Sequence, residues 1–237
     1  MENDVTEFST VPFLGVPVIA SAPDVVLPNL GSIYHDAPRR IVFLEAWDIW
    51  RLVWSKKLRS RWAAASIHVM AVTGPSVAMI RLATGRRVPR FGRFHTVIRT
   101  LSHAEEHGAR VFLLDRRIET LQKVEANLRS TFPGLHIAGR SVLSKSVADS
   151  VQVAIKKSAA HFVLAGLGKE GRRHWISDNY QSFGTALSIN AHEVFGTMTG
   201  GNSPFRIWLA VRIPAYCLLV LVLLGIRVFS SGTRGKQ

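Results

Sequence analysis

The chain has 237 residues, which suits one domain with its own hydrophobic core and a short appendage. Its 30 Lys and Arg residues against 16 Asp and Glu residues give a net charge of +14, which favours anionic partners such as phosphorylated substrates or acidic lipids. The sequence has no zinc-finger pattern and no aromatic RNA-binding signature, so we expect no nucleic-acid partner. The single cysteine, Cys217, excludes an intrachain disulfide, and the acidic start of the chain is not a signal peptide.

The first part of the chain alternates apolar segments with turn residues. Residues 11–20 predict a strand or hairpin, and residues 39–62 predict a strand that continues into a helix rich in tryptophan. We interpret these tryptophans as core residues, with an acceptor-lipid or interface surface as the alternative. Residues 65–85 predict a strand, a turn that begins at Thr73, and a second helix.

An arginine-rich stretch follows, from Arg81 to Arg99, without any acidic residue. One interpretation is a solvated basic face. The other is a clamp for pyrophosphate or anionic head groups, because guanidinium groups bind phosphate oxygens in pairs. Residues 96–107 then predict an amphipathic helix.

Residues 109–168 carry the clearest pattern, in which three apolar strands alternate with two helices. The strands are expected at 109–115, 135–139 and 161–168, and the second helix at about 144–158. This alternation predicts a right-handed parallel sheet that binds its ligand at the carboxyl ends of the strands. Those ends would be Asp115, Gly139 with Arg140, and Gly166 with Gly168, all at the edge that bears Thr73. Residues 185–204 add a last strand and a short helix, so residues 1–204 predict a Rossmann-like α/β domain with flanking helices.

Residues 205–237 have a different character. From Ile213 to Ile226 the chain has 14 residues without a charge, which as a helix would be about 21 Å long, shorter than the ~30 Å hydrocarbon core of a bilayer. The apolar segment reaches spanning length when it is extended to 207–229, where Arg212 and Arg227 lie near its ends and can reach head groups. We therefore expect a membrane helix, either spanning or re-entrant, with a buried carboxy-terminal helix as the alternative.

Three phrases also fit a known family pattern. They are RVFLLD from Arg110, the helix end and strand NLRSTFPGLHIAG, and FVLAGLG followed by Trp175. In this order and spacing they resemble the WecG/TagA/CpsF family of glycosyltransferases over roughly residues 11–204. The resemblance implies transfer of a hexose or N-acetylhexosamine from a UDP-sugar to a polyprenyl-diphosphate-linked acceptor, without a metal or other cofactor. It implies that this transfer serves the synthesis of exopolysaccharide or another cell-surface polysaccharide. It also implies attachment to the cytoplasmic face of the inner membrane, with other polysaccharide-synthesis proteins as possible partners.

Candidate site residues follow from this resemblance and from the glycine turn before a basic helix start, which can hold a phosphate. The family's catalytic aspartate is replaced by Thr73, and threonine is no base at neutral pH without help, so no catalytic residue is assigned. Glu45 is a weaker carboxylate candidate. His192 and Glu193 are expected to be a surface helix cap, with a new functional pair of polar side chains as the alternative. The candidates for substrate binding are Arg90, Gly92, Gly166, Gly168, Lys169, Arg172, Arg173, Arg206 and Arg212.

The sequence departs from the family pattern at several strand ends. Asp115 and Arg116 stand where the family has two glycines, and side chains at residues 169–173 and 188–193 replace its usual phrases. Such side chains hinder the approach of the backbone to a phosphate. We therefore expect little or no transfer of the family type. The sequence leaves two functions open: an active glycosyltransferase, or a catalytically inactive relative that acts as a scaffold or regulatory subunit of a polysaccharide assembly complex.

Overall fold

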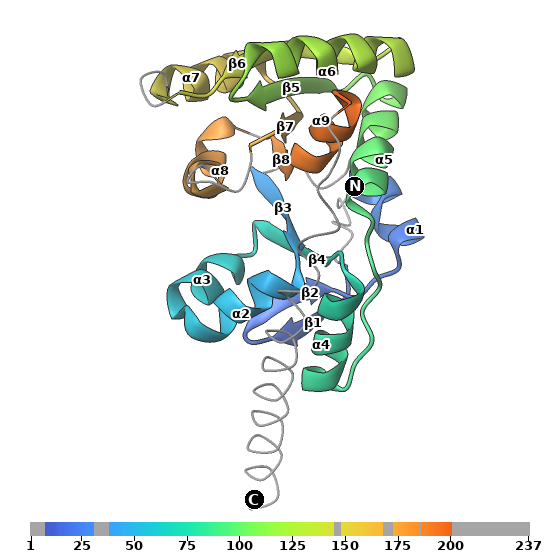
Figure 1. Ribbon diagram of the computed structural model, residues 1–237, viewed down its shortest axis with the longest axis vertical. Coiled ribbons are helices and arrows are strands. Elements are labelled where there is room, and N and C mark those ends of the chain that lie inside the picture. The colour runs from blue at the N-terminus through green and yellow to red at the C-terminus, as the bar shows by residue number, and fades with distance from the viewer. Residues whose placement is uncertain (1–7, 31–37, 145–147, 168–172, 185, 201–237) are drawn as a thin grey trace, which may run out of the picture.

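A computed structural model describes residues 8–30, 38–144, 148–167, 173–184 and 186–200 (Figure 1). The strands are β1 Thr10–Phe13, β2 Val16–Ile19, β3 Arg39–Leu44, β4 Ile67–Ala71, β5 Arg110–Asp115, β6 His136–Val142, β7 Phe162–Ala165 and β8 Leu187–Asn190. The helices are α1 Pro23–Val26, α2 Ala46–Trp54, α3 Lys56–Trp62, α4 Gly74–Thr84, α5 Arg93–Glu106, α6 Ile118–Thr131, α7 Ala148–Ser158, α8 Arg173–Asn179 and α9 His192–Met198, with a 3-10 turn, η2, at Tyr180–Phe183.

The described strands form one sheet in the order β1-β2-β4-β3-β8-β7-β5-β6. Strands β1 and β2 form an antiparallel hairpin through Leu14 and Gly15, whose φ angles of 52° and 79° are those of a tight two-residue hairpin turn. Every other neighbouring pair is parallel. The prediction of a mostly parallel α/β sheet with flanking helices is therefore confirmed, as is the hairpin expected at residues 11–20.

Helices cover both faces of the sheet because both faces are apolar. Along β5, Val111 and Leu113 pack into one hydrophobic cluster, whereas Phe112 and Leu114 pack into the other. The first of these clusters also holds residues of α1, α5, α6 and α9, and the second holds residues of α2, α3, α4, α7 and α8. The parallel strands are thus shielded from water on both sides, as such sheets require.

The carboxyl edge of the sheet differs in one place from the prediction. Thr73 follows β4, Asp115 ends β5 and Gly166 follows β7, so these three lie at one edge, as expected. Strand β6, however, continues through Gly139 to Val142, which pairs with Asp115. The prediction that Gly139 and Arg140 end a strand is therefore wrong. Strand β6 lies at the edge of the sheet and its residues are half-exposed, so it lacks the apolar run from which the length of a strand is predicted.

The interpretation of the tryptophans as core residues is only partly right. Trp62 of α3 is buried, but Trp47 and Trp54 of α2 are 45% and 68% exposed. The expected membrane helix lies within residues 201–237, outside the described residues, and so does the proposed boundary after residue 204. None of the helices in the described ranges is long and apolar enough to cross a bilayer.

Candidate functional site

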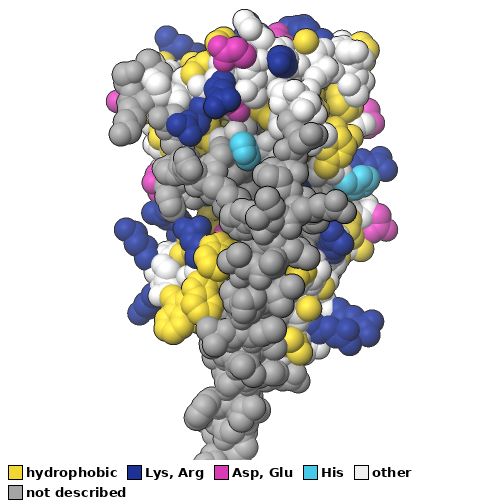
Figure 2. Space-filling model, viewed as in Figure 1, with side chains coloured by type: hydrophobic (Ala, Val, Ile, Leu, Met, Phe, Trp, Pro, Cys, Tyr) yellow, Lys and Arg dark blue, Asp and Glu magenta, His cyan; other side chains and the backbone are white. Residues whose placement is uncertain are grey.

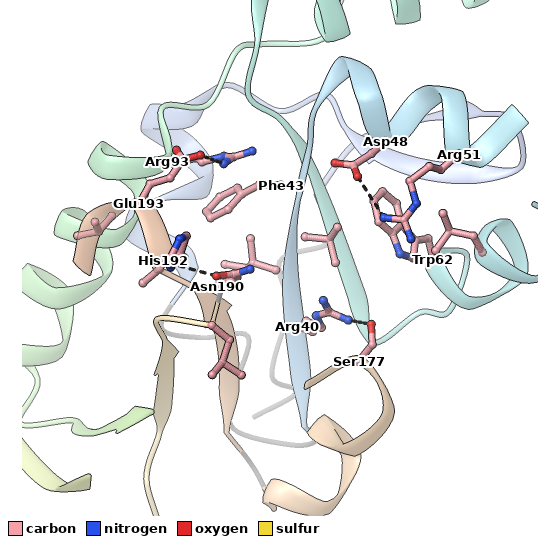
Figure 3. A pocket seen from close by; sticks show the side chains of 16 residues that line it. Arg40, Phe43, Asp48, Arg51, Trp62, Arg93, Ser177, Asn190, His192 and Glu193 are labelled. Carbon is pink, nitrogen blue, oxygen red and sulfur yellow. Dashed lines mark hydrogen bonds and ion pairs between the residues drawn. The ribbon is translucent and has the colours of Figure 1, made fainter. Parts of the chain in front are cut away.

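The cleft that we take as the candidate site surrounds the carboxyl half of β3, and we call it the β3 cleft. Strands β3 and β8 are paired only as far as Ile41 and Ile189, so the two strands are no longer hydrogen-bonded to each other beyond these residues. Figure 3 shows Phe43, Arg93 and His192 on one side of β3 and the side chains of α2 and α3 on the other. The polar lining residues are Arg40, Asp48, Arg51, Arg93, Ser177, Asn190, His192 and Glu193.

Arg93 joins three segments of the chain at the mouth of the β3 cleft. It is the first residue of α5, and its guanidinium group forms ion pairs with Glu45 and with Glu193. The same group lies 5.8 Å from the ring centre of Phe43. The two ion pairs differ in exposure, because the Glu45 side chain is 11% exposed and that of Glu193 is 60% exposed. The pair with Glu45 is therefore structural, whereas the pair with Glu193 is open to water and can be exchanged at low cost.

His192 is fixed by the strand end beside it. Its Nδ1 atom lies 2.8 Å from the carbonyl oxygen of Gly166, and its backbone N–H donates to the side chain of Asn190. A carbonyl oxygen only accepts hydrogen bonds, so Nδ1 carries the proton, and Nε2 of the neutral ring keeps its lone pair. No hydrogen bond to Nε2 is found among the described residues, and the ring lines the β3 cleft. With Nδ1 protonated, Nε2 is the ring atom that can accept a proton.

Asp115 lies behind His192, at the end of β5. Burial raises the pKa of its carboxyl group, while hydrogen bonds from the backbone N–H groups of Arg117 and Arg116 oppose this rise, as does His192 whenever its ring is protonated. Its Oδ1 atom accepts those hydrogen bonds at 3.0 Å and 2.6 Å. The carboxylate thus turns toward the backbone of its own turn, and Asp115 is not among the residues that line the β3 cleft.

Gly166 is surrounded by side chains. A Cβ atom at this position would lie well inside 3.0 Å of both Asp115 Oδ2 and Phe195 Cδ2. The site therefore accepts only glycine for reasons of packing, and Gly166 in turn supplies the carbonyl group that holds His192. Gly139 is confined in the same way, because a Cβ there would lie 2.9 Å from Phe112 Cε2.

Comparison with known proteins decides the family. Residues 11–205 match the glycosyl transferase WecG/TagA/CpsF family, which is most of the chain. The chain belongs to the WecG/TagA/CpsF family of glycosyltransferases. This membership indicates a glycosyltransferase of cell-surface polysaccharide synthesis, with a sugar donor and an acceptor as substrates. No curated protein matches the chain.

Thr73, which the family resemblance aligns with the catalytic aspartate, lies outside the β3 cleft. Thr73 is the N-cap of α4, where its hydroxyl group accepts from the backbone N–H of Ser76 and donates to the Ser76 hydroxyl. These bonds satisfy the first turn of the helix and occupy the only polar group of the side chain. Thr73 is therefore a capping residue in this structure, and it does not line the cleft.

Two other predicted substrate-binding residues are also placed beside the cleft. Arg90 is exposed and donates from Nε to the backbone carbonyl of Val72, at 3.2 Å. Gly92 is the N-cap of α5 and so positions Arg93, which the sequence analysis counted only as part of the arginine-rich stretch. The other arginines of this stretch are also exposed, in agreement with a solvated basic face: Arg81, Arg86, Arg87 and Arg99.

The remaining predicted residues are only partly described. Gly168, Lys169, Arg172, Arg206 and Arg212 lie outside the described residues, and Arg173 is the first residue of α8. Their assignment to substrate binding remains a prediction. His192 is exposed at the start of α9, in agreement with the surface position expected for it, and it also lines the β3 cleft. The signal that pointed to it was the replacement of family glycines by a polar pair at the end of the last strand.

A possible metal-ligand cluster lies away from the β3 cleft, on the last turn of α5. Ligand atoms of His103, Glu106 and His107 are within 4.8 Å of one another, and the two histidine rings stack with their centres 4.0 Å apart. Burial, and then the neighbouring His107, lower the pKa of His103. None of these residues lines the cleft, so the cluster gives no reason to place a metal at the candidate site.

Proposed function

We propose that the protein is a membrane-associated glycosyltransferase in which His192 serves as the base that activates the acceptor. It would transfer a hexose or N-acetylhexosamine from a UDP-sugar to a polyprenyl-diphosphate-linked acceptor, at the cytoplasmic face of the inner membrane. The observation that carries the proposal is the imidazole of His192, which is held at Nδ1 by Gly166 O and belongs to a residue that lines the β3 cleft. This base lies at the carboxyl edge of the sheet, where α/β proteins bind their ligands.

The reaction would be a single displacement with inversion. The acceptor hydroxyl gives its proton to His192 Nε2, its oxygen forms a bond to the anomeric carbon, and the bond from that carbon to the phosphate oxygen breaks. UDP leaves with the electron pair of that bond. A base placed within hydrogen-bond reach of the hydroxyl is typically worth ~10²–10⁴-fold in rate.

Arg93 is suited to bind the donor diphosphate. Its ion pair with Glu193 is exposed and worth little, so a phosphate oxygen can replace that carboxylate while Glu45 still holds the other side of the guanidinium group. A guanidinium group held in this way presents two parallel donors to a phosphate. The donor would thus lie between Arg93 and His192, which both line the cleft.

The test compares three full-length chains in detergent with a panel of UDP-sugars and a lipid-diphosphate acceptor. We expect His192→Asn, which keeps a hydrogen-bond donor but has no base, to lower kcat by ~10²–10⁴-fold. We expect Thr73→Ala to keep the turnover of the native chain, because the Thr73 hydroxyl is occupied by its capping bonds. Turnover that is unchanged by His192→Asn would refute the assignment of the base.

A catalytically inactive relative is the second candidate, and one observation favours it. The hydroxyl of Thr73 caps a helix, and the carboxylates of Glu45 and Glu193 are both paired with Arg93. Such a protein would act as a scaffold or regulatory subunit beside other polysaccharide-synthesis proteins. Absence of turnover in the native chain, together with its restoration by Thr73→Asp, would support this function against the first.

Attachment to the membrane is part of the proposal and rests on the uncharged sequence from Ile213 to Ile226. We expect the full chain to sediment with membranes and to stay there in a high-salt wash, because insertion of apolar side chains is not screened by salt. Complete release of the protein by high salt alone would show that charge and not insertion holds it.

A further inference from the structure

The face of α2 that points away from the core carries an unusual group of side chains. Trp47, Trp50 and Trp54 follow one another at helical spacing, and the rings of Trp50 and Trp54 lie 5.8 Å apart. Trp47 and Trp54 are largely exposed, whereas the opposite side of α2 is buried. Exposed aromatic side chains in such number are not needed for folding and indicate a surface that meets another apolar phase.

Positive charge surrounds these rings. Residues 46–62, which form α2 and α3, contain five basic residues and a single acidic one, Asp48. Arg51 pairs with the buried Asp48 at 3.7 Å and Arg61 pairs with Asp178 at 3.0 Å, so the charges of these two arginines are partly offset. Lys56 and Lys57 are exposed and form no ion pair within the part of the chain that the structure describes. In Figure 2 the hydrophobic side chains over α2 and α3 lie between dark blue Lys and Arg side chains, at the lower left.

We propose that this tryptophan surface, formed by Trp47, Trp50, Trp54, Lys56 and Lys57, docks onto an anionic lipid bilayer. Tryptophan prefers the boundary between head groups and acyl chains, and lysine beside it binds acidic head groups. A protein partner fits less well, because lysine is depleted at protein interfaces, while here it adjoins the rings. The proposed contact is formed by residues of α2 and α3 and does not depend on whether the protein transfers a sugar.

The groove between α2 and α3 adds to the fit. Apolar and cationic groups occur side by side in this concave surface, together with one carboxylate that is paired with Arg61; the lining residues are Trp50, Arg51, Trp54, Ser55, Lys57, Leu58, Arg61 and Asp178. A phospholipid offers the matching pair, an anionic head group and an apolar chain. The proposed occupant is therefore the acidic lipid of a bilayer.

The test uses the full chain and a spin label, so that immersion of this surface is measured apart from attachment by any other segment. Ser60 is exposed on α3, one turn from Lys56 and Lys57, and would carry the label as Ser60→Cys in a Cys217→Ser background. The matched control carries the label at Ile118→Cys, an exposed position on α6 in the opposite helix layer. Vesicles contain phosphatidylcholine with or without phosphatidylglycerol, and collisions with oxygen and with a water-soluble nickel complex report depth.

We expect the label at residue 60 to lose nickel collisions and gain oxygen collisions on vesicles with phosphatidylglycerol, while the label at residue 118 is unchanged. Lys56→Gln with Lys57→Gln should lower the ratio of immersed to water-exposed label about 30-fold, since each lysine near an acidic surface is worth ~1 kcal/mol. Trp47→Ala with Trp54→Ala should abolish immersion, and circular dichroism would verify that these chains are folded.

Three results would overturn the proposal. The label at residue 60 could remain accessible to nickel on acidic vesicles, which would place the tryptophan surface in water. It could be immersed equally without phosphatidylglycerol, which would remove the role of the lysines. It could be shielded without any vesicles, increasingly with protein concentration, which would identify a second copy of the chain as the occupant.

Discussion

Replacement of Gly166 by alanine would place a methyl group between two buried side chains. The new Cβ would lie well inside 3.0 Å of Asp115 Oδ2 and Phe195 Cδ2, and 2.9 Å from Phe195 Cε2. Neither neighbour can turn into solvent, because Asp115 is 6% and Phe195 2% exposed. Overpacking of this kind typically costs ~1–3 kcal/mol, and two simultaneous clashes favour the upper end. We therefore expect Gly166→Ala to lower the free energy of unfolding by about 3 kcal/mol.

The assay is denaturant unfolding of the full chain in detergent micelles, followed by circular dichroism. Gly196→Ala is the matched control, since Gly196 lies within α9 and its Cβ would meet no atom within 4 Å. Alanine is favoured over glycine in a helix, so Gly196→Ala should raise the free energy of unfolding by ~0.5–1 kcal/mol. Equal stability of Gly166→Ala and the native chain would refute the packing argument. Loss of donor binding at unchanged stability would instead support the substrate-binding role that the family resemblance implies.

Three further predictions concern single side chains. Arg93→Met should lower the free energy of unfolding by ~3–5 kcal/mol in the same unfolding assay, because it removes the cation that is paired with the buried carboxylate of Glu45. The control Arg99→Met, at an exposed position of the same helix, should change that free energy by less than about 0.5 kcal/mol. Burial lowers the pKa of His68 from 6.5 to about 4, so as the pH falls the unfolded chain is protonated at this residue before the folded chain. The free energy of unfolding should therefore fall by up to ~3 kcal/mol as the pH falls from about 6.5 to about 4. His68→Gln should remove that part of the pH dependence. An unchanged pH profile of unfolding in His68→Gln would contradict this prediction. Thr73→Ala should lower the free energy of unfolding by ~1 kcal/mol, because the side-chain cap of α4 is lost. Thr73→Ser keeps the hydroxyl group and is the control. Equal melting temperatures of the two variants would show that the cap contributes nothing to stability.

The elements that local patterns specify were predicted well. The apolar run before Asp115 is β5, and the helix that follows ends at Thr131, just before Pro133 and Gly134 stop it. The turn at Thr73 is the N-cap of α4. Each of these features depends on neighbouring residues, so a single segment of sequence contains all the information. Strand β6 was cut short, because its last residues are held by pairing with β5 and not by an apolar pattern of their own.

The candidate site was predicted less well, because it is assembled from residues far apart in the chain. Arg93 pairs with Glu45 across 48 positions and with Glu193 across 100 positions. His192 takes its tautomer from the carbonyl group of Gly166, 26 positions away, and Gly166 must be glycine because Asp115 and Phe195 converge on it. By itself the sequence determined the family, the alternation of strands and helices and the basic charge, since these depend on composition and local order. Only the tertiary structure decided which arginine enters the cleft, which histidine keeps a lone pair there, and that Thr73 is a cap, because these properties arise from contacts made when the sheet is complete.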